Sequence, residues 1–326
     1  MQLTTPVQIP AITHLISDQK PIALTGSCFA ESIGEKFRAC CFRVCVNPFG
    51  IVYNPAAMFT QLQLIASNTK FSKADLLLHD GLYHSMMHHG SFSHPDPEKA
   101  LQTINLAIEN AREIITEAGI LIITTGTSMV YRYAETGKVV SNCHKIPAAR
   151  FERFRLTHEE IVAQWKQTRD ALKILNPDLR FLFTVSPVRH LKDGAHGNQL
   201  NKAVLLLAID QICKSDSDAE YFPSYEIFLD ELRDYRFCAD DMSHPNALAV
   251  KYIWEKFSTS CIEPQLRQKI AEIEKIHKLA MHRPLHTKNS DSDEAISKAI
   301  LRLKQLSANS PGMDTSALES LLLQKK

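Results

Sequence analysis

The chain has 326 residues, of which 44% are hydrophobic and 22% are charged, and its formal net charge is +1. This length suits one large domain or two ordinary ones and allows a substantial core. The near balance of charge provides no field that would attract nucleic acid or an anionic membrane, and no apolar run approaches the roughly 18 residues of a membrane span.

The expected location is the cytoplasm, because the first residues lack the cationic start and apolar segment of a signal peptide. The 8 cysteines form no Cys-x-x-Cys pair, so most should be free thiols in a reducing compartment rather than disulfides or zinc ligands. We therefore expect no metal, no organic cofactor, no nucleic-acid partner and no membrane partner.

The first part of the chain predicts alternating strands and helices. A strand over 22–25 ends at a glycine and leads into a helix-like stretch, and a second strand covers 42–46. A helix over 54–66 begins with an Asn cap and a Pro at its first position. A long helix over 96–117 then precedes the clearest strand, 119–125.

The alternation continues through residue 261. A Thr-x-x-Glu capping box opens the helix that is predicted over 157–175. The elements predicted after it are strand 180–185, helix 198–214, a weaker strand at 220–222, and helices 225–232 and 246–261. This order indicates a mostly parallel sheet that is covered by helices on both faces, which is an α/β fold.

Three residues follow the carboxyl ends of these strands: Gly26, Gly126 and Ser186. Because ligands in parallel sheets bind at the carboxyl ends of the strands, these residues should face one crevice. Two segments interrupt the alternation: residues 79–95 are rich in His, Gly and Ser, and residues 129–155 predict a hairpin followed by a loop. Long loops over such a crevice are commonly functional.

The character of the sequence changes after Glu263. Residues 264–284 predict an amphipathic helix, 287–294 a polar linker, and 295–306 and 313–324 two short helices. We therefore divide the chain into an α/β domain, 1–263, and a helical tail, 264–326. The tail would either pack on its own domain or pair with a second copy of the chain to form a homo-oligomer.

The turn after the first strand carries the first candidate for catalysis. Gly26 permits a tight turn that presents Ser27 or Cys28 at a helix N-terminus, where backbone N–H groups can hold an oxyanion. Either side chain would be a nucleophile. The alternative is an ordinary turn with a buried cysteine.

Two further stretches carry suitable side chains. Asp241 lies three residues before His244, so its carboxylate can orient the imidazole and stabilise the protonated form; otherwise, this is a capping Asp beside an exposed His. Cys143, His144 and Lys145 offer a thiol, a base and a cation, or else form an ordinary surface loop.

Several ordered motifs resemble those of the GSCFA family. They are GSCFAESIG, NPFGIVYNP, TGTSMVYR, NCHKIP, TVSPVRHLKDG, YFPSYEIFLDELRDYRF and DDMSHPN, and the match runs from about residue 5 to 260. That family is similar to the SGNH, or GDSL, hydrolases, which have a flavodoxin-like three-layer fold. The resemblance implies this fold and an acyl-ester hydrolase or acyltransferase that works through an acyl-enzyme. The expected substrate is a small molecule, with a carbohydrate or polyol ester as the guess.

The SGNH superfamily places its nucleophile in Gly-Asp-Ser and its base in Asp-x-x-His-Pro. In this register Cys28 matches the nucleophilic Ser, and Asp241 and His244 match the dyad without any shift. Ser27 would then cap the helix or donate a hydrogen bond, whereas a turn shifted by one residue would present its hydroxyl instead. Gly50 resembles the oxyanion glycine that follows the second strand.

One motif departs from the superfamily pattern. The usual Gly-x-Asn-Asp block is replaced by Gly126, Thr127 and Ser128, which lack the oxyanion asparagine. The loss of one such donor typically costs ~3 kcal/mol of transition-state stabilisation. This departure favours an alternative function, a catalytically inactive ligand-binding protein on the same scaffold. Another alternative is a thiol-based activity in which Cys28 and Cys143 cooperate.

Other polar residues would line the substrate crevice. Ser186, Arg189 and His190 follow the fourth strand, and Arg189 suits either bidentate contact with a carboxylate or phosphate or a structural ion pair. His84 belongs to a histidine-rich stretch that has no accompanying carboxylate ligand pattern. We therefore expect it to line the crevice rather than to hold a metal.

Overall fold

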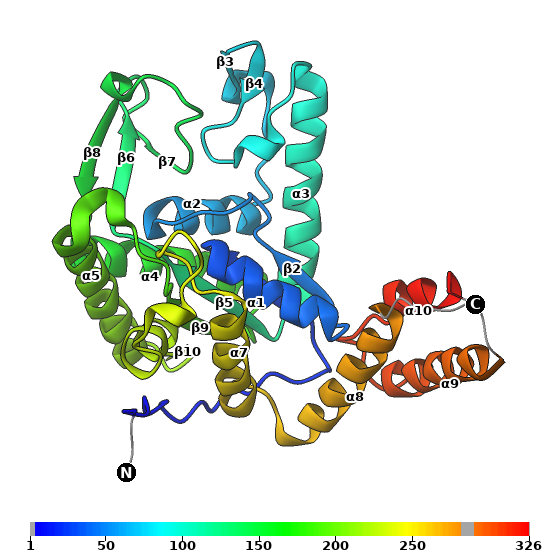
Figure 1. The fold of residues 1–326 in the computed structure, drawn as a ribbon. Helices are drawn as coiled ribbons and strands as arrows, with labels where there is room; N and C mark the ends of the chain where they lie inside the picture. Colours follow the sequence, from blue (N-terminus) through cyan, green and yellow to red (C-terminus); the bar gives the residue numbers. More distant parts are fainter. Residues whose placement is uncertain (1–3, 282–289, 326) are drawn as a thin grey trace.

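The computed structural model describes residues 4–281 and 290–325. At its centre is a five-stranded parallel sheet with the order β10-β9-β5-β1-β2 (Figure 1). Its strands are β1 (Ile22–Gly26), β2 (Val44–Val46), β5 (Ile120–Thr125), β9 (Arg180–Val185) and β10 (Ala219–Tyr221). Counted along the chain, the order from the β2 edge is 2-1-3-4-5, which is that of flavodoxin-like sheets. With helices on both faces, the predicted three-layer α/β fold is confirmed.

Four helices bury their apolar sides against one face of the sheet. They are α2 (Pro55–Ala66), α3 (Pro97–Glu117), α4 (His158–Leu175) and α5 (Gly194–Ser215). Their inward residues form one core with alternate residues of the strands. Trp165 of α4 lies at its centre, with its ring 4.8 Å from the ring of Phe181 and 4.8 Å from that of Phe183.

The opposite face is covered by α1 (Cys28–Ala39), α7 (Ala247–Cys261), the short helix α6 (Ser224–Glu226) and a π-helical turn, η5 (Ile227–Glu231). The rings of Phe37 and Trp254 pack edge to face 5.1 Å apart and join α1 to α7. The helix predicted over 225–232 consists of α6 and η5, which together cover 224–231 and are partly π-helical.

The tail helices extend this second core. They are α8 (Pro264–Met281), α9 (Ser290–Ser307) and α10 (Ser316–Leu323), and Ile270, Leu303 and Leu322 lie in the same hydrophobic cluster as α1 and α7. The N–H of Gly312 donates to the Asp18 carbonyl oxygen at 2.8 Å. In this structure the tail therefore packs on its own domain.

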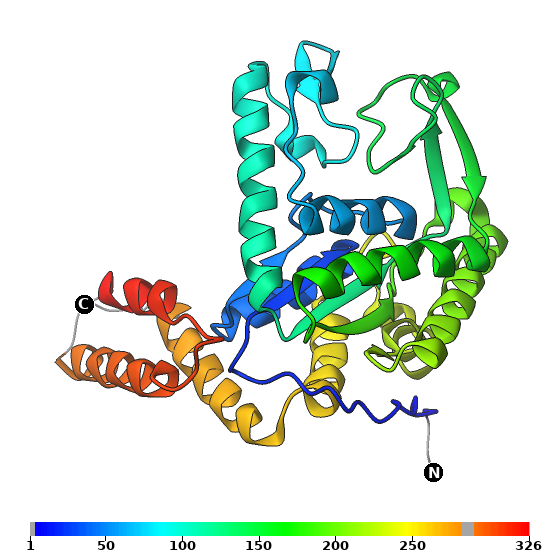
Figure 2. The ribbon, with the colours of Figure 1, turned by 180° about the vertical axis from the view of Figure 1, so that it is seen from behind.

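Two small β structures stand at the end of the molecule away from the tail, as the two views in Figures 1 and 2 agree. One is the hairpin of β3 (Leu77–His79) and β4 (Leu82–His84). The other is a three-stranded sheet with β6 (Met129–Tyr133) between β7 (Val139–Val140) and β8 (Phe151–Arg155). The sequence predicts the β6–β7 hairpin but assigns a loop where β8 lies.

Several other element boundaries differ from the prediction, and three of the differences are informative. Strand β2 begins at Val44, because Phe42 instead forms a bridge with Met313 of the tail. Helix α5 begins at Gly194 rather than Asn198. Helix α9 begins at Ser290, so residues 290–294 of the predicted linker are helical, while 282–289 lie outside the described residues. Short 3-10 turns occupy Lys73–Asp75, Gly90–Phe92, Ala148–Arg150, Leu191–Asp193 and Tyr235–Phe237.

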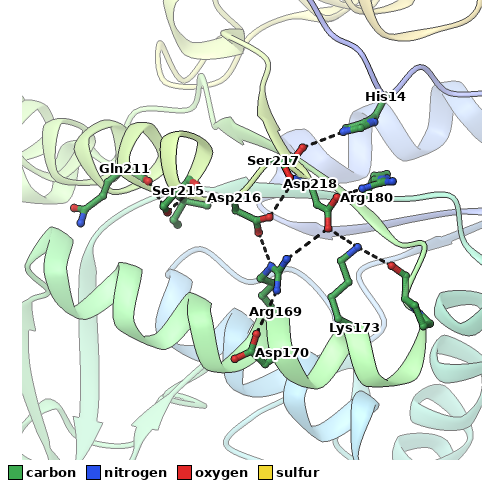
Figure 3. Close-up of polar contacts among 12 residues, drawn as sticks. His14, Arg169, Asp170, Lys173, Arg180, Gln211, Ser215, Asp216, Ser217 and Asp218 are labelled. Atoms are coloured by element: carbon green, nitrogen blue, oxygen red, sulfur yellow. Dashed lines mark hydrogen bonds and ion pairs between the residues drawn. The ribbon is translucent and has the colours of Figure 1, made fainter.

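An ion-pair network fixes the edge of the sheet at which β9 and β10 begin (Figure 3). Asp218 pairs with Lys173 at 2.6 Å and also with Arg169 and Arg180. The Arg169 Nε donates to Asp216 at 2.8 Å. These charges lie at the amino ends of the strands and so do not belong to the crevice at the carboxyl ends. Within the described ranges, no helix is long and apolar enough to cross a membrane.

Candidate active site

The turn after β1 shows which of its two side chains faces the crevice. Gly26 has φ +143°, and a Cβ atom there would lie 2.2 Å from the Thr124 carbonyl oxygen, so the turn requires glycine. Ser27 is fully buried, and its Oγ accepts the Phe29 N–H at 3.2 Å as the N-cap of α1. Cys28 begins the helix and is partly exposed, so it is the side chain of this turn that a reagent can reach.

Tyr53 lies against the Cys28 thiol. Its hydroxyl is 3.6 Å from the Cys28 Sγ. Burial raises the pKa of Tyr53, and the contact with Cys28 raises it further, so the phenol keeps its proton at neutral pH and can donate it to the sulfur. Tyr53 was not singled out in the sequence, because it shows no spacing or pattern of its own within NPFGIVYNP.

Asp241 and His244 form the pair that the sequence predicts. The Asp241 Oδ2 lies 2.5 Å from the His244 Nδ1, and the Asp241 Oδ1 accepts the N–H groups of Ser243 and His244, both at 2.9 Å. These hydrogen bonds, first that from the His244 N–H, lower the pKa of Asp241 to about 2. The carboxylate is therefore ionised across the working range of pH and holds the proton on Nδ1, which leaves Nε2 as the basic nitrogen.

The loop that carries this pair is attached to the segment that follows β9. The Arg189 N–H donates to the Ser243 carbonyl oxygen at 3.1 Å. In both Figure 1 and Figure 2 the yellow loop before α7 lies beside the N-terminal end of α1. The two parts of the candidate site therefore reach the same edge of the sheet. Among the described residues, however, no hydrogen bond joins the His244 ring to Cys28.

A second imidazole packs on the tyrosine that contacts the thiol. The His190 ring packs against the Tyr53 ring at 5.3 Å, and its Nε2 is buried without a hydrogen-bond partner among the described residues. A Cβ atom on Gly126 would lie 3.1 Å from this nitrogen. Burial lowers the pKa of His190 to about 4, so the ring is neutral at neutral pH.

Several backbone N–H groups near the candidate site already donate to acceptors within the protein. The N–H groups of Gly126 and Thr127 donate to the Tyr53 carbonyl oxygen at 2.7 and 3.1 Å. The Gly50 N–H donates to Asn47 at 2.7 Å. The match of Gly50 to an oxyanion glycine is therefore corrected, because this N–H is not free. For the Cys28 N–H no acceptor occurs among the described residues.

The hydroxyls of this edge differ in their availability. The Thr127 Oγ1 accepts the Met129 N–H at 3.1 Å and keeps its own proton to donate. Ser128 is fully buried and donates to Asn201 at 3.2 Å, and Ser186 is also fully buried. The sequence predicts that these serines face an open crevice. Both are instead buried beside the carboxyl ends of the strands.

Lys202 of α5 ties two strand ends together. Its Nζ donates to the carbonyl oxygens of Gly126 and Ser186, both at 2.7 Å. The side chain is 1% exposed, and burial lowers the pKa of Lys202 to about 7. No sequence pattern predicts this role, since a lysine within an amphipathic helix usually faces solvent.

His84 of β4 and His144 of the loop after β7 connect the two inserted β structures. The His144 Nε2 lies 2.8 Å from the Ser85 carbonyl oxygen, and the rings of His84 and His144 are 4.4 Å apart. Both are buried, so the expectation that His84 lines the crevice is corrected, and His144 does not lie on an exposed surface loop. Cys143 and Cys28 are both free thiols, and burial raises the pKa of Cys143. Lys145 is exposed. In the part of the chain that the structure describes, no cluster of three or more metal-ligating side chains occurs.

The buried histidines predict a loss of stability in mild acid. Burial lowers the pKa of His88 to about 3 and that of His144 to about 4, against 6.5 in an unfolded chain. As the pH falls from 6.5 towards 4, the unfolded chain takes up protons that the folded protein cannot. Each fully buried imidazole then lowers the free energy of unfolding by up to about 1.4 kcal/mol per pH unit.

Urea unfolding at several pH values checks this expectation. His88 stacks on Phe49 with ring centres 4.3 Å apart, so His88→Phe should fit the site and reduce the slope of stability against pH. The exposed His196 provides the control, because His196→Asn should leave that slope unchanged. Identical slopes for wild type and His88→Phe would contradict the assignment of this histidine.

The fold and these side chains define an α/β protein with a thiol, an imidazole hydrogen-bonded to a carboxylate, and a tyrosine at the carboxyl edge of its sheet. The chain belongs to the GSCFA family, whose sequence model matches residues 21–257. No curated protein matches the chain. One similar solved structure is that of an acetyl xylan esterase (Est2A) from the rumen bacterium Butyrivibrio proteoclasticus, with 10% identity and a TM-score of 0.36. The match covers 77% of this chain and 64% of that one, less than two thirds of its length. A similarity this distant does not identify a function.

Proposed function

We propose that this protein is an acyl-ester hydrolase or acyltransferase that works through a thioester on Cys28. The observation that carries the proposal is the position of two groups on one edge of the sheet. Cys28 is partly exposed at the N-terminus of α1, and the loop beside it holds His244 against an ionised Asp241. An accessible thiol and an oriented imidazole are the two parts that acyl transfer requires.

The chemistry would proceed in two stages. The His244 Nε2 takes the thiol proton while the Cys28 sulfur attacks the ester carbonyl carbon, and the carbonyl oxygen becomes an oxyanion. The Cys28 N–H and the Thr127 hydroxyl are the donors available to it, and the N-terminal end of α1 favours negative charge there. When the intermediate collapses, the carbon–oxygen bond breaks and the imidazolium gives its proton to the leaving alkoxide.

In the second stage an incoming hydroxyl group attacks the thioester carbonyl. His244 takes the proton of that hydroxyl and then returns a proton to the Cys28 sulfur as the carbon–sulfur bond breaks. Water gives hydrolysis, and a hydroxyl of an acceptor gives acyl transfer. We propose a carbohydrate or polyol ester as the substrate, on the resemblance to the SGNH hydrolases.

A binding function without turnover is a second candidate, and a specific observation favours it. The N–H groups of Gly50, Gly126 and Thr127 are all bonded within the protein, so few donors remain for an oxyanion. A site with these features could still bind an ester or its alcohol.

Turnover of short-chain nitrophenyl esters separates the two candidates. The enzyme proposal expects His244→Ala to lower kcat/KM by roughly 100-fold or more, because it removes the general base. His196→Ala, on the surface of α5, should not change it. His190→Ala tests the second imidazole. If kcat/KM fell in His190→Ala and not in His244→Ala, the general base would be His190. No turnover by wild type of any ester would favour the binding function.

A further inference from the structure

A hollow of about 200 Å³ lies beside the loop that carries Asp241 and His244. Phe228 and Leu232 form apolar walls and are themselves buried, while Tyr235 is 68% exposed at its margin. The lining also includes Arg189 and Arg233. The hollow therefore combines apolar surface with two guanidinium groups next to the candidate dyad.

Arg189 is not satisfied by the protein around it. Its Nη2 donates to the Met242 carbonyl oxygen at 3.3 Å, but its Nε is buried and has no acceptor among the described residues. Within those same residues, no carboxylate lies within ion-pair distance of its guanidinium. A buried donor without an acceptor costs free energy, and an anion that reached this guanidinium would supply an acceptor that the described residues do not.

Asp234 also lines the hollow, but neither it nor the nearby Asp230 pairs with Arg189. Asp234 faces Arg236 at 3.3 Å and accepts the N–H of the same residue at 2.8 Å. Arg233 has a carboxylate, Asp230, only at 3.6 Å, and the Arg233 side chain is 80% exposed. The hollow is therefore left with positive charge.

We propose that this hollow binds a carboxylate or phosphate that the substrate carries on a short apolar group, with Arg189 as the receptor for the anion. The guanidinium fork matches the oxygen spacing of both anions. The apolar group would pack against Phe228 and Leu232. Because Arg189 is bonded to Met242 and to Ser243, a bound anion lies beside the loop that presents His244. The inference that the ligand is an ester rests on the proposed function, whereas anion binding does not.

Calorimetric titration of the full chain tests anion binding without any need for turnover. The probes are phenyl phosphate and phenylacetate, with inorganic phosphate and benzyl alcohol for comparison. Wild type should bind phenyl phosphate more tightly than inorganic phosphate and should bind benzyl alcohol least. Arg189→Gln should weaken binding of both aromatic anions by about tenfold to a hundredfold, the effect of one lost charge-assisted hydrogen bond.

Two further variants make the result decisive. Arg132→Gln removes an exposed arginine on β6 and should bind like wild type. Arg233→Glu reverses a charge at the exposed margin of the hollow, so it should fold like wild type and should also weaken binding of both aromatic anions. This variant tests anion binding if Arg189→Gln does not fold. Unchanged binding in both hollow variants, or an equal loss in Arg132→Gln, would overturn the proposal.

Turnover of a matched pair of esters separates this proposal from the catalytic one. The pair is the 4-nitrophenyl ester of glutaric acid, which is an anion, and the same ester with its free acid methylated. Arg189→Gln should raise KM for the anionic ester by about tenfold more than it raises KM for the neutral ester. Anion binding that depends on Arg189 without turnover of either ester would keep the hollow and reject catalysis. Turnover of both esters with an unchanged KM for the anionic ester in Arg189→Gln would support catalysis and reject the hollow as the anion site.

Discussion

Cys28→Ala is expected to lower ester turnover by roughly a thousandfold or more, since it removes the atom to which the acyl group would bind. The alanine should not disturb the fold, because Ser27 caps α1 and Gly26 forms the turn without help from the sulfur. Steady-state kinetics with a nitrophenyl ester measures the effect. Cys28→Ser tests the same position with a weaker nucleophile and should retain part of the activity.

The control for this prediction is a thiol of similar exposure in a different layer. Cys213 lies on α5, is also partly exposed and has its pKa raised to about 12 by burial. Cys213→Ala should therefore turn over esters like wild type. If Cys28→Ala kept full activity, the nucleophile would have to be another side chain, and Ser27 is too deeply buried to take its place without a change in the turn.

Asp241→Asn has the second largest expected effect, a loss of roughly 100-fold or more in kcat. The amide oxygen can still accept the N–H groups of Ser243 and His244, so the loop should keep its shape. What is lost is the negative charge that stabilises the imidazolium and the acceptor that holds the proton on Nδ1. A loss in kcat with a normal circular dichroism spectrum would show that the change acts on the reaction.

The dependence of activity on pH adds a further expectation for Asp241. Because the pKa of Asp241 is lowered to about 2, the carboxylate stays charged as the pH falls, and any acid loss of activity above pH 4 must come from another group. The matched control is Asp210→Asn, which removes an exposed carboxylate that pairs with Lys214 at 2.7 Å. An equal loss in both variants would point to a general electrostatic effect and against a role for Asp241 in catalysis.

The central sheet could be predicted from the sequence because its strands are short apolar runs that glycine or proline ends. Residues 120–125 and 181–185 are buried on both faces, and such strands carry a strong hydrophobic signal. Strand β8 could not be predicted in this way. Its residues, Phe151–Arg155, are mostly charged and exposed, and they form a strand because they pair with β6.

The prediction of helix boundaries was wrong where tertiary contacts, rather than local sequence signals, set the start of a helix. Helix α5 begins with two glycines within its first four residues, and the side chain at its N-cap, Asp193, makes no capping hydrogen bond. Instead, the side chain of Asn198 accepts the His190 N–H at 2.9 Å and anchors the start of the helix. No propensity rule places a helix start at such a position.

The candidate site was predictable only in part for a similar reason. Cys28, Asp241 and His244 lie in short motifs with characteristic spacing, so the sequence alone identifies them as candidate catalytic residues. Tyr53 and Lys202 act through their three-dimensional neighbours, a sulfur and two carbonyl oxygens, to which no sequence spacing points. Their roles follow from the way in which β1, β5 and β9 end side by side.

Peptide mapping by mass spectrometry, after a nitrophenyl acetate reaction is quenched in acid, tests the central claim most directly. The account predicts one acetyl group on the peptide that contains Cys28, its formation slowed in His244→Ala. Ester turnover by wild type with the acetyl group on another residue, or with Cys28 never acetylated at any quench time, would contradict it.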